Sequence, residues 1–463
     1  MNMHLGGRVL TQKEMTEILE QALTILETIG VTVENQSLLK YLDEGGGSVD
    51  YRQMRVFFSR RYVMDFLQES EKIQWEDKTV SFGASAEIYQ GKYLDPRDGG
   101  YKPWTRERLK EYALVARNLP EIDRVTMLGY PVGDVPVLLQ PLYEKIFCWK
   151  YGIEGGTAIW QTDLCGKILE MFQAYAQEQN RPLKEVFNCG VFLISPLKFA
   201  ATEAEQYLYF YEKGLAVTVG TLGSLGGTAP VTAAGALSLH LAENLFINIL
   251  QRIFWGAKKL EFGNSLSCLD MASGNFQYGR PEQVLLNIAG AQIAEYLGAS
   301  YVGHGGLSDA KVPGNESAAQ KLISAVFNGV TSGYGHISAG LLSVDEVFSP
   351  VQMILDNEAM GSLRYIARGM TVDEENLALE TIEGVGPGGN FLGTEHTAVN
   401  FRESFWWPAL WSDCMFQKWD SSGRKTDVDK AREKFFSIVQ DAEPLPPQIS
   451  PELERELLQI IEK

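Results

Sequence analysis

The spacing of apolar residues divides the chain near residue 123. Before that point, apolar residues at helical spacing predict helices over residues 11–29, 36–42 and 60–69, and short apolar runs between them predict strands. Thr11 followed three residues later by Glu14 is typical of a capping box, so the first helix is expected to begin there. We expect residues 1–122 to form a small α+β cap with a lead-in.

Beyond residue 123, short apolar runs alternate with helical stretches. The runs lie at residues 125–128, 156–161, 186–194, 216–221, 260–264, 300–304 and 329–337. Six helical stretches lie between them, at residues 136–151, 163–177, 201–213, 232–255, 281–297 and 315–327. A seventh is expected to begin at Pro350, with Ser349 as its N-cap. Alternation at this spacing predicts a parallel sheet with helices outside it.

The number of units indicates the architecture. Seven strand–helix units, with an eighth strand near residues 390–393, fit a closed (β/α)8 barrel of TIM type better than an open sheet. The expected fold class is therefore α/β, with the barrel over residues 123–442 and a C-terminal tail and helix over residues 443–463. The sequence carries no GxGxxG fingerprint, no Walker A motif and no GxSxG elbow.

The longest apolar stretch, residues 231–257, is interrupted by polar side chains. His240, Glu243 and Asn244 are among them, so the stretch predicts a largely buried helix and not a membrane span. The first ten residues show no signal peptide. Five cysteines without a CxxC pair argue against a disulfide framework or a structural zinc site. We expect a cytoplasmic protein without a membrane partner.

Charge and glycine content narrow the class of ligand. The 463 residues include 41 Lys and Arg and 59 Asp and Glu, a net charge of −18. That balance disfavours a nucleic-acid binder and tolerates a cationic ligand. Glycine is in excess, with 45 residues, and many follow predicted strands, as Gly303, Gly305 and Gly306 do. Such glycines either bring backbone close to a ligand or make tight turns.

Three of the five histidines end or follow predicted strands: His304, His336 and His396. No closely spaced ligand pair such as HxxxH is present, so we expect no metal site. Single roles are expected instead, either a hydrogen bond to an anionic group of a ligand or loop packing. Asp309, which follows Gly305-Gly306-Leu307-Ser308, is expected to cap a turn or to face a ligand.

Aromatic residues lie in or next to the predicted strands. Aromatic faces around a quaternary ammonium group stabilise it by cation–π attraction. The alternative for each ring is ordinary packing in the barrel or against a helix. The residues concerned are Trp160, Phe187, Phe192, Tyr301, Tyr334 and Phe391.

Three stretches together resemble the trimethylamine methyltransferase family. The first covers residues 10–69, with Ile25-Leu26-Glu27-Thr28-Ile29-Gly30-Val31 at its centre. The second is Gly305-Gly306-Leu307-Ser308-Asp309-Ala310-Lys311, followed by Phe348-Ser349-Pro350 and Asp356-Asn357-Glu358. The third is Phe391-Leu392-Gly393-Thr394-Glu395-His396-Thr397, followed by Phe401-Arg402-Glu403 and Trp407-Pro408. Their order and spacing make the resemblance specific over nearly the whole chain.

The resemblance implies a (β/α)8 barrel that passes a methyl group from a methylamine to Co(I) of a separate corrinoid protein. Relatives that use trimethylamine carry pyrrolysine, whereas this sequence has standard residues throughout. It therefore resembles the branch without pyrrolysine, whose substrates are quaternary amines such as glycine betaine, proline betaine and carnitine. The resemblance thus implies cobalamin carried by a partner protein and no tightly bound cofactor of the chain's own. We also expect a homo-oligomer.

The same resemblance suggests roles for individual residues. His336 is the expected catalytic residue, because it lies near the region where relatives carry pyrrolysine, and it is expected to bind a substrate carboxylate. The remaining substrate-binding candidates are Trp160, Tyr301, Tyr334 and Phe391 around the ammonium group, with His304, Asp309 and His396. Two alternatives stay open: another barrel enzyme, such as a lyase or a metal-dependent hydrolase, and a non-catalytic betaine-binding protein.

Overall fold

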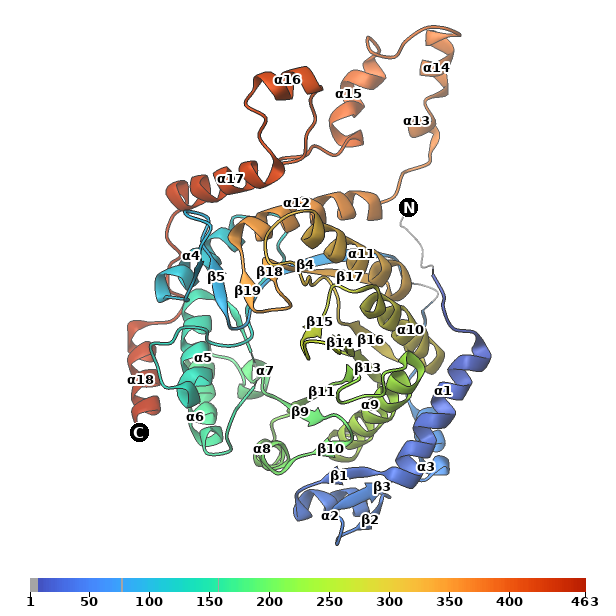
Figure 1. Ribbon diagram of the computed structural model, residues 1–463, viewed down its shortest axis with the longest axis vertical. Helices are drawn as coiled ribbons and strands as arrows, with labels where there is room; N and C mark the ends of the chain where they lie inside the picture. The colour runs from blue at the N-terminus through green and yellow to red at the C-terminus, as the bar shows by residue number, and fades with distance from the viewer. Residues whose placement is uncertain (1–6, 76–77, 157) are drawn as a thin grey trace.

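The computed structural model describes residues 7–75, 78–156 and 158–463, and it shows a ring of parallel strands surrounded by helices (Figure 1). The strands of the ring are β4 (Ser81–Ile88), β7 (Arg124–Met127), β8 (Glu154–Gly155), β9 (Gly190–Ile194), β11 (Thr218–Leu222), β13 (Glu261–Asn264), β16 (Ser300–Gly303) and β17 (Tyr334–Ala339). The α/β architecture predicted from the alternation of runs is confirmed.

Most neighbouring strands of the ring are joined by parallel ladders. These join β17 to β4, β4 to β7, β7 to β8, β9 to β11 and β13 to β16. A single bridge from Ala158 to Gly190 links the β8 side to β9. Beyond the ends of β11 and β13, the parallel pair of β12 (Ser224–Leu225) and β14 (Ser267–Leu269) continues the ring.

The ring is not closed as expected, because no ladder joins β16 to β17 among the described residues. The chain leaves β16 through Gly305 and Gly306, and the Ser338 amide donates one hydrogen bond to the Gly306 carbonyl at 3.1 Å. Gly306 has a φ of +75°, and a Cβ atom there would lie 2.1 Å from the His336 carbonyl oxygen. Only glycine permits this approach, so the two backbones meet at one point without forming a ladder.

The eighth strand of the ring is β4. Residues 390–393, where the sequence pattern placed the eighth strand, form a turn away from the ring instead. The sequence Ser-Phe-Gly-Ala-Ser-Ala-Glu-Ile of β4 has no continuous apolar run. Its alternate residues Phe82, Ala84, Ala86 and Ile88 are buried toward the helices. β4 lies within the segment that the sequence pattern assigned to the cap and lead-in.

Helices cover the outside of the ring (Figure 1). They are α4 (Arg106–Arg117), α5 (Gln140–Tyr151), α6 (Leu164–Glu178), α8 (Ala201–Tyr211), α9 (Ala233–Trp255), α10 (Pro281–Leu297), α11 (Asn315–Ser332) and α12 (Pro350–Ala367), with the short α7 (Leu183–Val186). α17 (Asp427–Asp441) packs on α12, and α18 (Pro451–Glu462) packs on α6. Ser349 caps α12 as expected, with Pro350 as its first residue.

The N-terminal unit packs beside the ring and also pairs with it. It consists of α1 (Gln12–Thr24), β1 (Val31–Val33), α2 (Gln36–Glu44), β2 (Ser48–Asp50), β3 (Arg55–Phe57) and α3 (Arg60–Glu69). The predicted capping box of Thr11 and Glu14 is present. β1 pairs in parallel with β10 (Lys198–Phe199), which follows β9, so the unit and the ring share one sheet.

The polar residues within α9 reach the strands beneath it. The Glu243 carboxylate accepts hydrogen bonds from Ser195 Oγ, Thr221 Oγ1 and the Leu197 amide at 2.8–3.0 Å. His240 Nε2 lies 2.7 Å from the Gly263 carbonyl oxygen. α9 is the one helix in the described residues that is long and apolar enough to cross a membrane, and 72% of its most apolar window is buried. It is a core helix, as its polar residues predicted.

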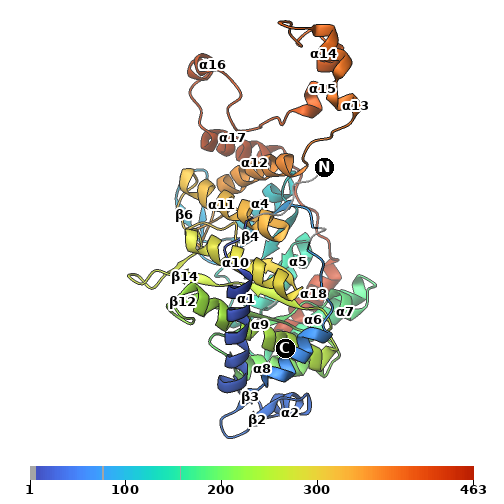
Figure 2. The same cartoon turned by 90° about the vertical axis from the view of Figure 1, so that its right-hand side faces the viewer.

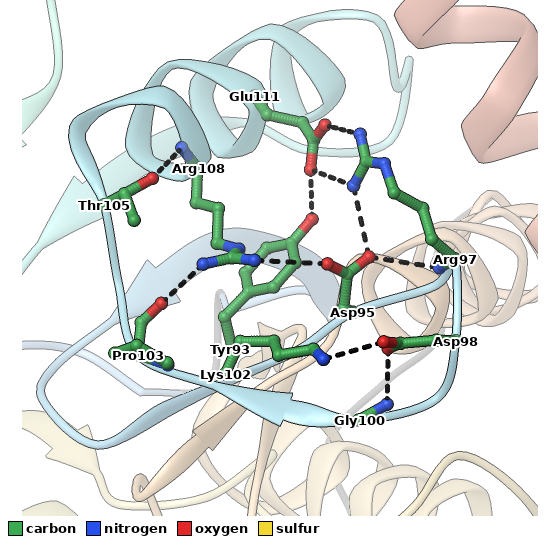
Figure 3. Close-up of polar contacts among 10 residues, drawn as sticks. All are labelled: Tyr93, Asp95, Arg97, Asp98, Gly100, Lys102, Pro103, Thr105, Arg108 and Glu111. Carbon is green, nitrogen blue, oxygen red and sulfur yellow. Dashed lines mark hydrogen bonds and ion pairs between the residues drawn. The ribbon is translucent and has the colours of Figure 1, made fainter.

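A second small sheet lies at the end of the ring where the strands finish. β5 (Lys92–Leu94) pairs with β6 (Tyr101–Lys102) and with β19 (Val347–Phe348), which pairs with β18 (Leu341–Leu342). Figure 3 shows how ion pairs fix the β5–β6 hairpin: Asp95 lies 3.1 Å from Arg97 Nη1 and 3.3 Å from Arg108 Nη2, while Glu111 of α4 binds both Arg97 and Tyr93. The hairpin is therefore tied to the body through α4.

Residues between α12 and α17 form an arm that stands away from the body in both views (Figures 1 and 2). Its helices are α13 (Glu374–Leu377), α14 (Leu379–Val385), α15 (Glu395–Ser404) and α16 (Phe416–Ser421), and none of them contains a buried residue. The Leu410 amide donates to Glu358 of α12 at 2.8 Å, which anchors the base of the arm.

A buried ion pair joins α11, α12 and β17. Lys321 Nζ lies 2.7 Å from Asp356 Oδ2 and donates to the Ser338 carbonyl at 2.8 Å. Asp356 also accepts from the Gly340 amide at 2.9 Å and from Gln352 Nε2 at 2.7 Å. Burial lowers the pKa of Lys321, and the Asp356 charge opposes that shift.

We expect Asp356→Asn to destabilise the protein strongly, because it leaves the Lys321 ammonium buried without a counter-charge. The expected loss is about 3–5 kcal/mol, measured as a fall in Tm by thermal unfolding. The double change Lys321→Met with Asp356→Leu removes both charges and is expected to recover most of that loss. Asp65→Asn, which breaks the exposed Arg61–Asp65 pair, is the control and should cost under about 1 kcal/mol.

Candidate functional site

The inside of the ring is reached by solvent, and we call it the lumen. Alternate residues of β9, Val191 and Leu193, are buried against the helices, whereas Phe192 and Ile194 between them are exposed. On β16, Val302 is 72% exposed. We call the end of the ring where the strands finish the mouth, since parallel strands place their C-terminal ends at one end. The lumen is thus open to solvent, and Phe192, Ile194 and Val302 present apolar side chains to it.

His336 lies on the lumen face of β17 and contacts a carboxylate. His336 Nε2 is 3.3 Å from Glu87 Oε1 on the neighbouring strand β4. Tyr334, two residues earlier on the same face, places its hydroxyl 3.5 Å from His336 Nδ1. The side chains of His336 and Glu87 are 20% and 17% exposed, so a ligand in the lumen can reach both.

The Glu87 carboxyl is held in its ionised form. Burial alone raises the pKa of a carboxyl, but hydrogen bonds from His336 and Ser338 and the nearby His336 charge hold the pKa of Glu87 below its usual range. A negative charge therefore lies in the middle of the lumen wall. Glu87 was missed in the sequence because the strand that carries it, β4, was not recognised.

His304 lies at the mouth, directly after β16. Its ring meets the Tyr278 ring edge to face at a centroid distance of 4.5 Å. Burial lowers the pKa of His304 to about 4, although the Glu87 charge opposes the shift, so the imidazole is neutral at pH 7. Its backbone amide donates to Asn287 Oδ1 at 3.0 Å, which fixes the turn against α10.

Two of the expected ligand-binding residues, Tyr301 and Asp309, make hydrogen bonds within the protein. The Tyr301 hydroxyl donates to the Asn287 carbonyl at 2.9 Å, and its ring stacks on Phe262, so Tyr301 lies between β16 and α10 and faces away from the lumen. The Asp309 carboxylate accepts from the Tyr278 and Gly279 amides at 2.8 and 2.9 Å. Asp309 thus fixes the loop before α10.

The other sequence candidates lie apart from His336. Trp160 is half-buried in the turn after the Ala158 bridge, and the preceding Ile159 carbonyl accepts from Gln206 at 3.0 Å. Phe391 and His396 lie in the arm, the latter on α15 (Figure 1). The structure therefore brings together His336, Tyr334 and Glu87, and it places His304 within the electrostatic reach of Glu87.

Further acidic and aromatic residues line the mouth. Burial raises the pKa of Glu144, on α5, to about 7, with Lys145 opposing the shift. Burial and the adjacent Glu346 also raise the pKa of Asp345, in the loop after β18. Within the described ranges, no three His, Cys, Asp or Glu side chains are grouped so as to hold a metal ion.

We expect the His304→Gln variant to lose less folding stability than the wild type as the pH falls below 6.5. His304 binds a proton with a pKa near 6.5 when unfolded and about 4 when folded, so its neutral form favours folding above pH 6.5. That contribution is lost as the pH falls from 6.5 toward 4. Thermal unfolding of the wild type and the variant between pH 7.5 and 4.5 measures it, and an unchanged slope in the variant contradicts a neutral buried His304.

Comparison with known proteins gives one family over nearly the whole chain. The model of the family described as trimethylamine methyltransferase matches residues 6–463. A trimethylamine methyltransferase of Desulfitobacterium hafniense is 25% identical, over 95% of this chain and 91% of the relative. A glycine betaine methyltransferase from another strain of that species is 27% identical, over 97% and 95%. A trimethylamine methyltransferase of Methanosarcina barkeri is 28% identical, over 64% and 59%.

Among solved structures, the monomethylamine methyltransferase of Methanosarcina barkeri aligns with 98% of this chain and 95% of its own. The TM-score is 0.44 and the identity is 10%. A likeness at this level says nothing of the site.

Proposed function

The chain belongs to the trimethylamine methyltransferase family and is a methyltransferase, and from that premise we propose that it moves a methyl group from a quaternary amine to Co(I) of a separate corrinoid protein. Glycine betaine, proline betaine and carnitine represent the substrate type. The observation that carries the proposal is the lumen wall, where the ionised Glu87 and His336 face a solvent-reached space that also exposes the apolar side chains of Phe192, Ile194 and Val302. Such a wall suits a ligand with a cationic and an anionic end.

The absence of pyrrolysine from the sequence is consistent with a quaternary substrate. When a quaternary ammonium gives up a methyl group, the group that leaves is a neutral tertiary amine. The methyl carbon therefore needs no covalent activation. The methyl carbon passes to the cobalt in line, the C–N bond breaks with its electron pair on nitrogen, and a neutral tertiary amine leaves. The protein supplies the position of the methyl group and the environment of the charge.

We assign to His336 the binding of the substrate carboxylate. When both ring nitrogens carry protons, Nε2–H donates to Glu87 and leaves Nδ1–H for a ligand, on the side of the Tyr334 hydroxyl. The two donors then hold one carboxylate. The neutral His304 and the amides of the Gly305–Gly306 turn are the further candidates at the mouth, where a partner protein has access.

Trp160, Phe391 and His396 are less favoured than His336 as substrate-binding residues, because no contact ties them to the lumen. Tyr301 and Asp309 are engaged by the protein itself. The alternative of a non-catalytic betaine-binding protein shares the same lumen and differs in lacking methyl transfer. A lyase or hydrolase differs in forming other products.

We expect His336→Ala to lose methyl transfer by at least about a hundredfold, because the carboxylate end of the substrate is no longer positioned. The measurement follows the conversion of cob(I)alamin to methylcobalamin by absorbance, with enzyme and each of glycine betaine, proline betaine and carnitine. Wild-type enzyme that converts cobalamin with none of these or any other quaternary amine contradicts the proposed function.

A His336→Ala variant with unchanged rates for every betaine contradicts only the role of His336. Unaltered thermal unfolding of the variant shows that the loss is not one of folding. Tyr334→Phe keeps the ring and removes one donor, so its KM for betaines should rise while its KM for tetramethylammonium should not. That split separates a carboxylate-binding role from a structural one.

We also propose a homo-oligomer, which the arm supports. The arm exposes large apolar side chains along its length, among them Leu377, Leu379, Leu392, Val399 and Met415. Exposed apolar patches of this kind are typical of interfaces.

The expected outcome in light scattering with size-exclusion chromatography is a mass of at least twice 51.6 kDa. Leu392→Glu with Met415→Glu should lower that mass, because charge at both positions opposes burial. The exposed change Met64→Glu, on α3, is the matched control. A wild-type monomer contradicts the oligomer and leaves the methyl-transfer proposal standing.

A further inference from the structure

Three loops that follow different strands meet at the mouth. Tyr89 follows β4, Tyr278 precedes α10 in the connection after β13, and Asp345 lies in the connection after β17. The Lys92 amide donates to the Glu346 carbonyl at 2.8 Å, which joins the first loop to the third. Val344 packs against the cluster of Tyr278, Leu307 and Leu341, which brings the third loop to the second. Asp345 is therefore held between the Tyr89 loop and Tyr278.

The backbone around Asp345 adopts costly conformations. Ser343 has a φ of +52° and Val344 a φ of +70°, a region that a β-branched residue rarely enters. Such conformations persist only where the surroundings enforce them. Here the Ser343 amide donates to the Ala310 carbonyl and the Val344 amide to the Ser308 carbonyl, both at 2.8 Å. Backbone strain of this kind clusters at ligand sites.

Glycine at position 91 allows the same loop to come close. A Cβ atom on Gly91 would lie 1.9 Å from the Glu346 carbonyl oxygen, and Gly91 has a φ of +91°. The hairpin that begins at Lys92 is in turn fixed by the ion pairs of Asp95 (Figure 3). The positions of Tyr89 and Asp345 relative to each other are therefore set by the backbone and not by contacts of their own side chains.

The side chains of this mouth cluster present aromatic rings and a carboxylate. Tyr89 is 42% exposed. Burial, and after it the Asp345 carboxylate, raise the pKa of both the Tyr89 and the Tyr278 hydroxyl, as expected for a carboxylate close to both rings. The Tyr278 ring is held edge to face on His304.

A second carboxyl, that of Glu144, lies close enough to Tyr89 to influence its hydroxyl. Glu144 is 5% exposed, and its Oε1 is buried without a hydrogen-bond donor in the part of the chain that the structure describes. Oε1 lies 2.7 Å from where a Cβ atom on Gly156 would be, at the end of β8, and the Glu144 charge also raises the pKa of Tyr89. A buried carboxyl oxygen without a side-chain partner calls for an explanation, and a cation bound beside it is one.

We propose that Asp345, Tyr89 and Tyr278 form a cation subsite that takes the quaternary ammonium group of the ligand, with Glu144 as its second carboxylate. A quaternary ammonium has no N–H to donate, so aromatic faces and carboxylate charge are the interactions that hold it. The subsite deepens the proposed function and rests on it. The ammonium end then lies at the mouth, where a methyl acceptor has access, and the carboxylate end lies deeper, at His336.

The test compares the affinity for a cation with the affinity for an uncharged molecule of the same shape. Choline and 3,3-dimethylbutan-1-ol have the same shape, but the central atom is a positively charged nitrogen in choline and a neutral carbon in the alcohol. Isothermal titration calorimetry gives a Kd for each. The full-length wild-type protein should bind choline more tightly than the alcohol. Asp345→Asn should reduce that preference about tenfold, and Tyr89→Leu about three- to tenfold, while the affinity for the alcohol changes little.

Matched controls are Asp65→Asn and Tyr51→Leu, both exposed in the N-terminal unit, and they should keep the wild-type preference. Tyr278→Phe is a second variant at the mouth, because it keeps the packing on His304. It should retain most of the preference, since the ring and not the hydroxyl contacts the cation. A wild type without a preference for choline, or an Asp345→Asn variant that keeps it, overturns the subsite.

The experiments distinguish a failure of the subsite proposal from a failure of the proposed function. Choline preference that depends on Asp345, together with no methyl transfer to cobalamin from any quaternary amine, supports the subsite and overturns the methyltransferase assignment for quaternary amines. Methyl transfer from a betaine, together with an unchanged preference in Asp345→Asn and Tyr89→Leu, overturns the subsite and leaves the proposed function intact.

Discussion

The buried ion pair of Lys321 and Asp356 fixes the end of β17, and the site depends on that strand. Lys321 binds the Ser338 carbonyl and Asp356 binds the Gly340 amide, so the pair holds the strand on both sides of Ala339. Among the described residues, β17 has a ladder to β4 alone, and its other edge makes a single hydrogen bond, from the Ser338 amide to Gly306 in the turn after β16. The orientation of His336 toward Glu87 therefore rests on one ladder and one ion pair, which links the packing of α11 and α12 directly to the geometry of the lumen.

The glycine excess has a local cause at two of these contacts. Gly306 lets the end of β16 approach the His336 carbonyl, and Gly91 lets the turn after β4 approach Glu346. In both places a Cβ atom would collide with backbone, which cannot move aside as the end of a flexible side chain can. The first contact narrows the open seam of the ring, and the second brings Tyr89 to Asp345. From the sequence, we expect a tight turn or a backbone approach to a ligand at Gly306. The structure shows there a close approach to another backbone segment, and contact with a ligand stays a prediction.

Helices such as α2 and α3 were predictable because each buries one face at a period of 3.6 residues. α9 is buried on nearly all sides, and its length and its interrupting polar residues predicted it instead. β4 was not, because Gly83, Ala84, Ser85 and Ala86 are too small to form an apolar run. Missing β4 also hid Glu87 and Tyr89. The face of Tyr301 was not predictable either, since strand register decides which alternate residues point into the lumen. The arm interrupts the strand–helix alternation, so the sequence placed residues 390–393 in the ring although they extend from the body.

The acidic mouth raises a question of how tightly a cation ought to be held. As the methyl group leaves, the positive charge on nitrogen disappears, so every attraction to that charge favours the ground state over the transition state and slows the transfer. Burial raises the pKa of Glu144 to about 7, so near neutral pH this carboxyl is partly protonated and attracts a cation less than a fully ionised group does. Glu87, which is ionised, pairs with His336 and so offers less charge to the ammonium. Selectivity for the cation then comes from the aromatic rings and carboxyls at the mouth, while positioning comes from the carboxylate end of the ligand, whose charge is the same before and after transfer.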